Sequence, residues 1–187
     1  MTVVSQIRAH RQAGFNLIEA AIVLGIVGLI VGGIWAAAGS AYENMRQQNA
    51  SKQLLALVQN IRSFYAQNPT DTIETASANL ISLGLVPADM VVNNTIRDPW
   101  GNSVTVSGGI AAQPSFTITF SMSRAACANF ISRVANAARG SGLLVAKGTG
   151  SDEYLNLVTN AAQVNTSTPS CGSAATATPS FTFSTRG

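Results

Sequence analysis

Few residues in this chain have side chains and spacings that could support catalysis. The only histidine, His10, precedes a long apolar run, and the only lysines are Lys52 and Lys147. A serine–lysine pair is therefore the one formal route to nucleophilic chemistry, since neither an imidazole base nor a histidine metal ligand follows residue 10. Asp152 and Glu153 are adjacent acids, but two are too few for a calcium site. The sequence predicts no enzyme, no cofactor and no metal site.

One acidic residue, Glu19, lies inside the apolar run. Residues 15–39 contain no other charged side chain. As a helix this run would extend roughly 37 Å, which is enough to cross a hydrocarbon core of about 30 Å. Arg8 and Arg11 precede it, which predicts that the N-terminus stays in the cytoplasm and that the rest is exported.

Three kinds of N-terminal segment fit this run: a cleaved secretory signal, a plain membrane anchor, and the leader of a subunit that polymerises. The run exceeds the roughly 7–15 apolar residues of a secretory signal, although small residues at 36–39 keep that alternative open. A carboxylate in a membrane-spanning helix costs about 2.5–3.5 kcal/mol, from which a plain anchor gains nothing. If cleavage made Phe15 the N-terminus, the Glu19 carboxylate of one polymer subunit could pair with the Phe15 amine of its neighbour.

The residues around Gly14 carry a resemblance to a known family. Residues 13–28 read AGFNLIEAAIVLGIVG, which resembles the prepilin processing site of type IV pilins and their relatives. The resemblance implies cleavage between Gly14 and Phe15 by the membrane prepilin peptidase, N-methylation of Phe15, and a role for Glu19 as the assembly carboxylate. A leader of 14 residues is typical of the type IVb group, whereas Phe as first mature residue is typical of type IVa.

Helical periodicity continues beyond the apolar run. Residues 40–67 contain neither Pro nor Gly, and their apolar residues recur at helical spacing on one face: Leu54, Leu57, Val58, Ile61, Phe64 and Tyr65. We therefore predict one helix over 15–67, ended by Asn68-Pro69. Glycines 25, 28, 32, 33 and 39 in its first half favour close packing against other helices.

The remaining elements are shorter. Thr70-Asp71 is predicted to begin a second helix that ends at Gly84. Pro87 is predicted to begin a short helical turn. The residues from Asp98 to Asn102 form a predicted tight turn. Further predictions are strands at 104–106, 116–120, 143–146, 154–158 and 181–183, a helix at 124–139 ended by Gly140, and a loop over 163–180.

Cys127 and Cys171 lack the spacing of a zinc or redox site. They are either buried free thiols or a disulfide, and an exported domain favours the disulfide. A disulfide between them would close a loop with 43 residues inside it. Closing a loop of that length would stabilise the fold by about 4 kcal/mol in the loop-entropy model.

Several stretches, 87–91, 95–101, 116–120 and 126–127, resemble the thin-pilus major pilins of conjugative plasmids and their pathogen relatives. The resemblance implies an α+β type IV pilin fold, in which a long N-terminal helix packs on an antiparallel sheet with a C-terminal disulfide-closed region. It divides the chain into a cleaved leader (1–14), a long helix (15–67, with 15–39 in the membrane or filament core) and a globular head (68–187). Residues 127–171 would lie on the filament surface.

Composition agrees with an assembled or membrane-bound protein. Charged residues make up 10% of the chain, against about 25% in ordinary soluble domains. The net charge of +3 falls almost to zero without residues 1–14, which contain Arg8 and Arg11, so it gives no support for nucleic-acid binding.

The function that these resemblances imply is a structural subunit, major rather than minor, of a type IVb pilus for adhesion, aggregation or conjugative contact. Its partners would be copies of itself, the prepilin peptidase, the inner-membrane assembly machinery, the membrane before assembly, and a host or recipient cell surface. It would begin in the inner membrane and end in an extracellular pilus. Two alternatives are a minor pilin or type II secretion pseudopilin, and a membrane-anchored binding domain or enzyme that never polymerises.

Overall fold

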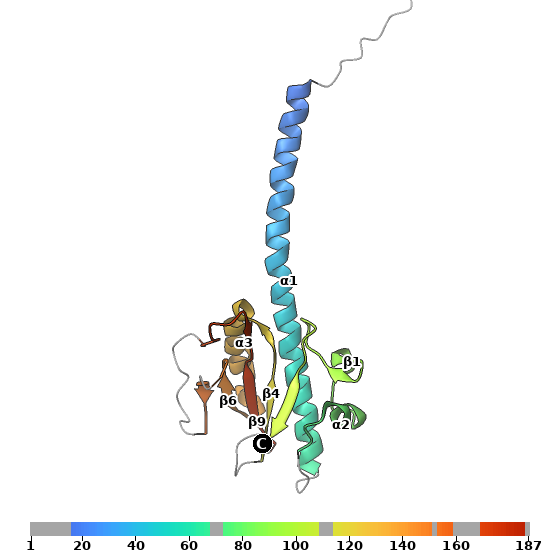
Figure 1. Cartoon of the computed structure of the whole chain (residues 1–187), viewed down its shortest axis with the longest axis vertical. Coiled ribbons are helices and arrows are strands. Elements are labelled where there is room, and N and C mark those ends of the chain that lie inside the picture. Colours follow the sequence, from blue (N-terminus) through green and yellow to red (C-terminus); the bar gives the residue numbers. More distant parts are fainter. Residues whose placement is uncertain (1–15, 68–72, 109–113, 151–152, 159–168, 186–187) are drawn as a thin grey trace, which may run out of the picture. The chain divides into compact units, whose positions relative to one another are not determined.

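The computed structural model describes residues 16–67, 73–108, 114–150, 153–158 and 169–185. The chain divides into two compact units, Met1–Tyr42 and Glu43–Gly187. The second unit is called the head below. Helix α1 (Leu17–Gln67) contributes residues to both units (Figure 1).

Helix α1 begins two residues after the predicted position. The side-chain oxygen of Asn16 accepts a hydrogen bond from the Ile18 N–H at 3.4 Å, and the Asn16 carbonyl accepts one from the Ala20 N–H at 3.1 Å. This is the arrangement of an N-cap, so Leu17 is the first helical residue. Phe15 lies outside the described residues.

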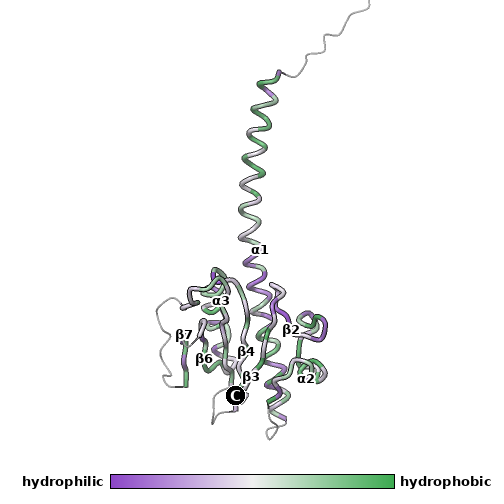
Figure 2. Tube along the Cα trace, in the orientation of Figure 1, coloured by the Kyte–Doolittle hydropathy of each residue, from purple (hydrophilic) through white to green (hydrophobic). Residues whose placement is uncertain are grey.

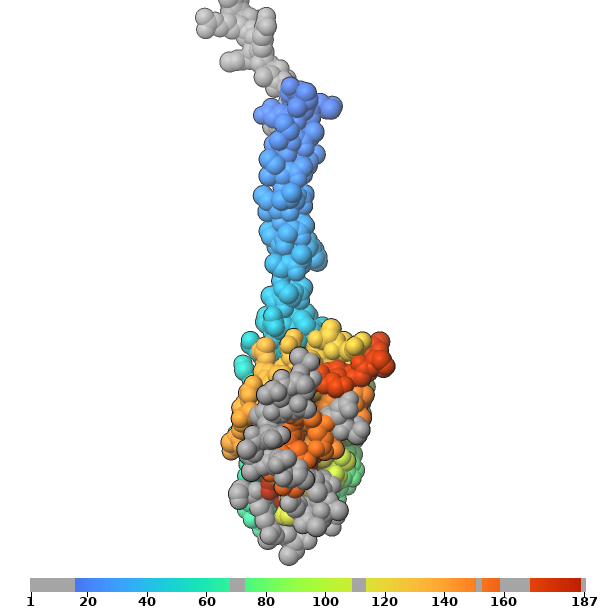
Figure 3. Space-filling view, turned by 90° about the vertical axis from the view of Figure 1, so that its left-hand side faces the viewer, coloured from blue at the N-terminus to red at the C-terminus, as the bar shows by residue number. Residues whose placement is uncertain are grey.

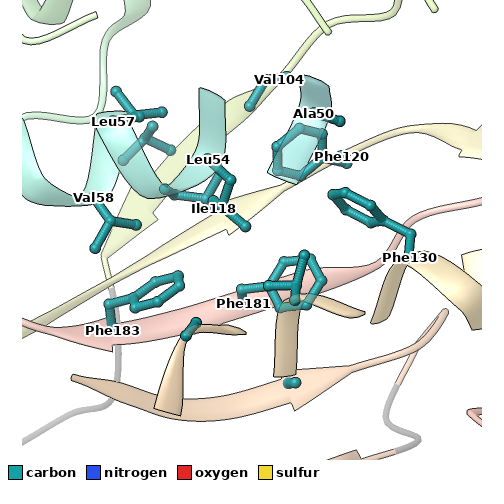
Figure 4. Packing of buried hydrophobic residues seen from close by; sticks show 14 of the residues in the cluster. Ala50, Leu54, Leu57, Val58, Val104, Ile118, Phe120, Phe130, Phe181 and Phe183 are labelled. Carbon is teal, nitrogen blue, oxygen red and sulfur yellow. The ribbon is translucent and has the colours of Figure 1, made fainter. Parts of the chain in front are cut away.

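In the head, α1 buries the face that its periodicity predicts. Leu54, Leu57, Val58 and Ile61 are fully buried, Tyr65 is nearly so, and Phe64 is half-buried against the same core. Figure 4 shows Leu54 and Val58 directed toward the sheet residues Ile118, Phe181 and Phe183. Because each such side chain contributes about 1.5–3 kcal/mol on burial, this face holds α1 to the head.

The sheet has five antiparallel strands in the order β3-β4-β9-β6-β7. The C-terminal strand β9 is central, and Phe116 and Ile118 of β4 lie opposite Phe183 and Phe181 of β9. Alternate residues of β4 and β9 are Ser or Thr, so one face of these strands is apolar and the other carries hydroxyls. The strand bounds are Thr105–Gly108, Ser115–Thr119, Ser180–Ser184, Leu143–Lys147 and Glu153–Asn156, in the same order.

Helix α3 (Arg124–Ala137) packs on the same apolar face through a cluster of aromatic rings. The Phe130 ring lies edge-on to Phe120 at 5.2 Å and to Phe181 at 5.7 Å between centroids. Ala138 ends the helix, and a short 3-10 helix η2 (Arg139–Ser141) follows. These elements give the α+β fold that the sequence predicts: a long helix, an antiparallel sheet and a disulfide between Cys127 and Cys171.

The predicted second helix is shorter than expected. Helix α2 spans Ser77–Ser82, and residues 73–76 are not helical. The prediction of a continuous helix from Thr70-Asp71 is therefore wrong. Residues 70–71 themselves lie outside the described part. The physical reason is a distant hydrogen bond, since the Tyr65 hydroxyl accepts the Glu74 N–H at 2.6 Å. Gly84 ends this region at a positive φ of 71°, as predicted.

Two small strand pairs were not predicted from the sequence. Strands β1 (Val91–Val92) and β2 (Thr95–Ile96), after the 3-10 helix η1 (Ala88–Met90), form a hairpin. The hairpin turns at Asn93-Asn94, both at positive φ, so the Asn-Asn pair is the signal that sequence reasoning missed. Strand β5 (Met122–Ser123) pairs with β8 (Thr176–Ala177), which corrects the predicted loop over 163–180 in its described part.

Candidate functional site

The first unit exposes apolar side chains all around its helix. Leu17, Leu29 and Trp35 keep 85%, 78% and 76% of their surface exposed, and no described residue from 16 to 42 is buried. Figure 2 shows this stretch as mostly hydrophobic. By length and composition, α1 is the one helix among the described residues that could cross a membrane. Such a surface needs either lipid or other helices around it.

Glu19 is the acid in the first turn of α1, and it is exposed. Its carboxylate forms no ion pair with another described residue. The Asn16 cap places this carboxylate within one turn of the helix start, where the helix dipole favours a negative charge. Gly14 and Phe15, the predicted processing site, lie outside the described residues.

The five glycines of the apolar segment have open space around them. A methyl group added at Gly25, Gly28, Gly32, Gly33 or Gly39 would meet no atom within 4 Å. Within the described part of one chain, no other element therefore packs closely against these glycines. Close packing would require a second helix.

The turn from Asp98 to Asn102 has a structural role in the head. The Asp98 Oδ1 accepts hydrogen bonds from the N–H groups of Trp100 and Asn102 at 3.0 and 2.8 Å, and the Asn102 amide donates to the Ser121 carbonyl at 2.6 Å. The described residues contain no cluster of acidic, histidine or cysteine side chains able to hold a metal ion. Burial raises the pKa of the Asp98 carboxyl, and the backbone hydrogen bonds only partly oppose this effect.

Sequence reasoning did not find the contact of this turn with α1. The Trp100 Nε1–H donates to Glu43 Oε1 at 3.0 Å, and the Trp100 ring lies edge-on to Phe130 with centroids 6.1 Å apart. The residues are 57 positions apart in the sequence, so no local pattern links them. The turn thus connects α1 with α3 inside the head.

The disulfide joins α3 to the segment before β8. Cys127 and Cys171 are buried, and their Cα atoms are 6.1 Å apart. Thr149 fastens the same segment, because its N–H donates to the Ser170 carbonyl at 3.3 Å and its hydroxyl to the Cys171 carbonyl at 3.2 Å. Gly148 makes this approach sterically feasible, since a Cβ there would lie 1.6 Å from the Ser170 oxygen. The sequence gives no signal for this close approach.

Comparison with known proteins identifies the family. A family model described as Bundlin matches residues 39–183, which include the head part of α1, four strands of the sheet, all of β9 except Ser184, and both cysteines, but not Gly14, Phe15 or Glu19. No match was found among the curated proteins or the solved structures. Bundlin is a structural pilin family and not an enzyme family. Since the match covers most of the chain and the fold agrees with it, this protein belongs to the bundlin family of type IV pilins.

Proposed function

We propose that the chain is a prepilin that becomes the major subunit of a type IVb pilus after cleavage between Gly14 and Phe15. Phe15 then carries an N-methylated amine, and the Glu19 carboxylate of one subunit pairs with the Phe15 amine of its neighbour. The observation that carries this proposal is Glu19 itself, an exposed acid in the first turn of an otherwise apolar helix surface. A charged partner near the helix start would offset the cost of such a carboxylate.

The apolar surface of the first unit supports a route from membrane to filament. In the inner membrane, lipid covers side chains such as Leu29 and Trp35. In the filament, helices of other subunits replace the lipid, and the open glycines allow those helices to approach closely. The prepilin peptidase and the inner-membrane assembly machinery act on this segment.

The head supplies the outer part of the filament. The disulfide and the Thr149 hydrogen bond fix Cys171 to α3 and to Thr149, which suits a surface exposed outside the cell. We assign contacts with host or recipient cells, or between filaments, to the region from Cys127 to Cys171. Adhesion, aggregation and conjugative contact are the processes it would serve.

The experiment is to shear surface filaments from cells that make the native chain, and to measure the intact mass and N-terminal sequence of the main protein. We expect N-methyl-Phe15 at the start and a mass two hydrogens below that of the reduced chain. High abundance in the sheared fraction identifies the major subunit, and trace abundance a minor one. A chain that starts at Met1, or that is cut near residue 38, contradicts the proposed processing.

Glu19→Ala tests the assembly role separately. We expect this variant to accumulate in the membrane and to be missing from the sheared fraction. Asn44→Ala, an exposed change on the head part of α1, is the matched control and should leave filaments intact. Normal filaments from the Glu19→Ala cells would contradict the proposed role of Glu19.

A further inference from the structure

Two hydrogen bonds identify the surface of the head at which α1 enters. Glu43 is the first residue of the head, and the buried residues of α1 begin at Gln47. The Trp100 Nε1–H donates to Glu43 at 3.0 Å, so the turn that contains Trp100 lies at this end. The Asn102 amide donates to the Ser121 carbonyl at 2.6 Å, which brings the segment before α3 to the same end. Figure 3 shows this yellow segment close to the cyan part of α1. We call the surface of residues 43–46, 97–102 and 121–124 the entry face.

Three arginines lie on the entry face, each from a different element. Arg46 belongs to α1, Arg97 precedes the turn, and Arg124 is the first residue of α3. Arg124 is exposed, and the other two are half-buried. The Arg97 guanidinium donates to the Gly101 carbonyl at 2.6 Å, which holds this cation at the tip of the turn.

The acids of the entry face do not balance these cations. Glu43 accepts the Trp100 indole N–H, and Asp98 is buried, with 6% of its surface exposed. The Arg124 N–H donates to the Ala175 carbonyl at 3.0 Å, and the adjoining residues 173–176 are exposed and uncharged. The accessible charge of the entry face is therefore basic.

Exposed apolar surface accompanies this charge. Met45 keeps 59% of its surface exposed within the first turn of the head, and Tyr42, directly before the head, keeps 60%. Tyrosine is enriched where proteins cross the membrane–water boundary, and arginine there places its stem on apolar surface and its charge in the headgroups. The residue types of the entry face are therefore those of a surface at a membrane boundary.

The length of the apolar segment sets the distance between the entry face and a membrane. Residues 20–42 contain no charged side chain, and as part of the continuous helix α1 they rise roughly 35 Å. A hydrocarbon core is about 30 Å thick, and the headgroup layer adds roughly 5–7 Å on each side. When this segment spans a membrane, Glu43 therefore lies at the depth of the headgroups. No spacer separates the head from the lipid.

We propose that the entry face binds anionic phospholipids of the leaflet on its side of the membrane, with Arg46 and Arg124 on the phosphate groups and Met45 in the headgroup layer. This inference rests on the membrane stage of the proposed function, before the subunit joins a filament. The ligand is a phospholipid because a phosphate accepts the paired N–H groups of a guanidinium. Basic residues next to a membrane-spanning helix are attracted to anionic headgroups.

A single-tryptophan chain tests the contact. The sequence contains two tryptophans, so Trp35→Phe leaves Trp100, on the entry face, as the only one. This full chain is reconstituted in phosphatidylcholine vesicles, with or without phosphatidylglycerol, that contain a lipid with a nitroxide on its headgroup. Quenching of the Trp100 fluorescence by the nitroxide reports the approach of the entry face to the headgroups. We expect stronger quenching with phosphatidylglycerol.

Removal of two arginines tests their role. Arg46→Gln with Arg124→Gln should lower the quenching in phosphatidylglycerol vesicles toward the level in phosphatidylcholine alone. The contact equilibrium should weaken about fivefold for each arginine removed. Arg46→Lys with Arg124→Lys keeps both charges and should retain most of the quenching.

Arg139→Gln is the matched control, because Arg139 is exposed at the other end of the head. Its 3-10 helix contacts Arg62 of α1, which donates to the Ser141 carbonyl at 2.7 Å. Arg62 lies roughly 28 Å along the helix from Glu43. This variant should be quenched like the Trp35→Phe chain. In every variant the disulfide and the Trp100 emission in neutral detergent must match those of the Trp35→Phe chain, which shows that the head is folded.

Flotation with the vesicles separates this inference from the proposed function. If the chain does not float with vesicles of either composition, the membrane stage fails and the lipid contact with it. If the chain floats, three results overturn the lipid contact alone. Quenching is the same with and without phosphatidylglycerol, or it is unchanged by Arg46→Gln with Arg124→Gln, or Arg139→Gln lowers it equally. Unchanged quenching together with a loss of filaments would assign the two arginines to a protein partner instead.

Discussion

The indole Nε1–H of Trp100 donates a hydrogen bond to the carboxylate of Glu43 at 3.0 Å. Glu43 is the first residue of the head, and Trp100 lies in the turn that Asp98 organises. The Trp100 ring also contacts Phe130 of α3. One half-buried indole therefore links the start of the head part of α1, the turn and α3.

Glu43→Ala is expected to destabilise the head by about 1–3 kcal/mol, because it removes a charge-assisted hydrogen bond and leaves the indole N–H of Trp100 without its acceptor. Glu43→Gln keeps a carbonyl oxygen and should cost less. The measurement is urea unfolding of the full chain in detergent, followed by tryptophan fluorescence. Gln48→Ala, an exposed change on α1, is the control. Equal stability of Glu43→Ala and the control would show that the contact contributes nothing.

Asp98 makes the stability of the head depend on pH. Burial raises the pKa of its carboxyl above the ordinary value of 3.8, so the folded state binds this proton more tightly than the unfolded state does. The resulting stabilisation is complete below pH 3.8 and is lost as the pH rises through the raised pKa. Asp98→Asn keeps an oxygen for the Trp100 and Asn102 N–H groups but cannot titrate.

We therefore expect the unfolding free energy of the native chain, minus that of Asp98→Asn, to be largest in acid and to fall toward neutral pH. Urea unfolding of both proteins over a pH series measures this difference. A difference that stays constant with pH, or that grows toward neutral pH, contradicts the assignment to Asp98. The pKa of Glu153 is shifted in the opposite direction to that of Asp98, because hydrogen bonds from Asn156 and Lys147 lower the pKa of its carboxyl.

Local patterns predicted much of the fold. The buried face of α1 follows from the spacing of Leu54, Leu57, Val58 and Ile61, and the alternation in β4 and β9 follows from hydroxyl and apolar residues in turn. The turn at Asp98 follows from its residue types. Each of these features is decided by neighbours in the sequence, which is why the sequence alone sufficed.

Features that depend on distant contacts could not be predicted. The Glu74 N–H, in the non-helical segment before α2, donates to the Tyr65 hydroxyl. The pairing of β5 with β8 unites strands more than fifty residues apart. The central position of β9 is a topological choice that no local pattern reveals. In the candidate site, Glu19 was predicted from spacing, whereas the bond between Glu43 and Trp100 and the contact of Gly148 with Ser170 were not.

Removal of the disulfide is expected to destabilise the head strongly. Cys127 and Cys171 are 44 residues apart, and closing a loop of that length is worth about 4 kcal/mol in the loop-entropy model. The double variant Cys127→Ala with Cys171→Ala should therefore unfold at a much lower urea concentration than the native chain. Its urea unfolding curve should match that of the native chain measured under reducing conditions. Unchanged unfolding after reduction would show that β8 and the Thr149 hydrogen bonds hold the segment without the disulfide.

Gly148→Ala tests the close approach between β6 and the cysteine segment. An added Cβ would lie 1.6 Å from the carbonyl oxygen of Ser170, and that oxygen belongs to the backbone, so the segment itself must move. Such a shift would weaken both hydrogen bonds from Thr149, to the Ser170 and Cys171 carbonyls. We expect a loss of about 1–3 kcal/mol, the range of an overpacked site.

Gly140→Ala is the matched control for this substitution, because a Cβ at Gly140 meets no atom within 4 Å and its φ is not positive. Amide hydrogen exchange should quicken at Thr149 and Thr178, whose N–H groups donate within this contact, in the Gly148→Ala chain and not in the control. Equal exchange in both variants would mean that the segment adjusts without losing these bonds. The close approach at Gly148 would then not be needed for these hydrogen bonds.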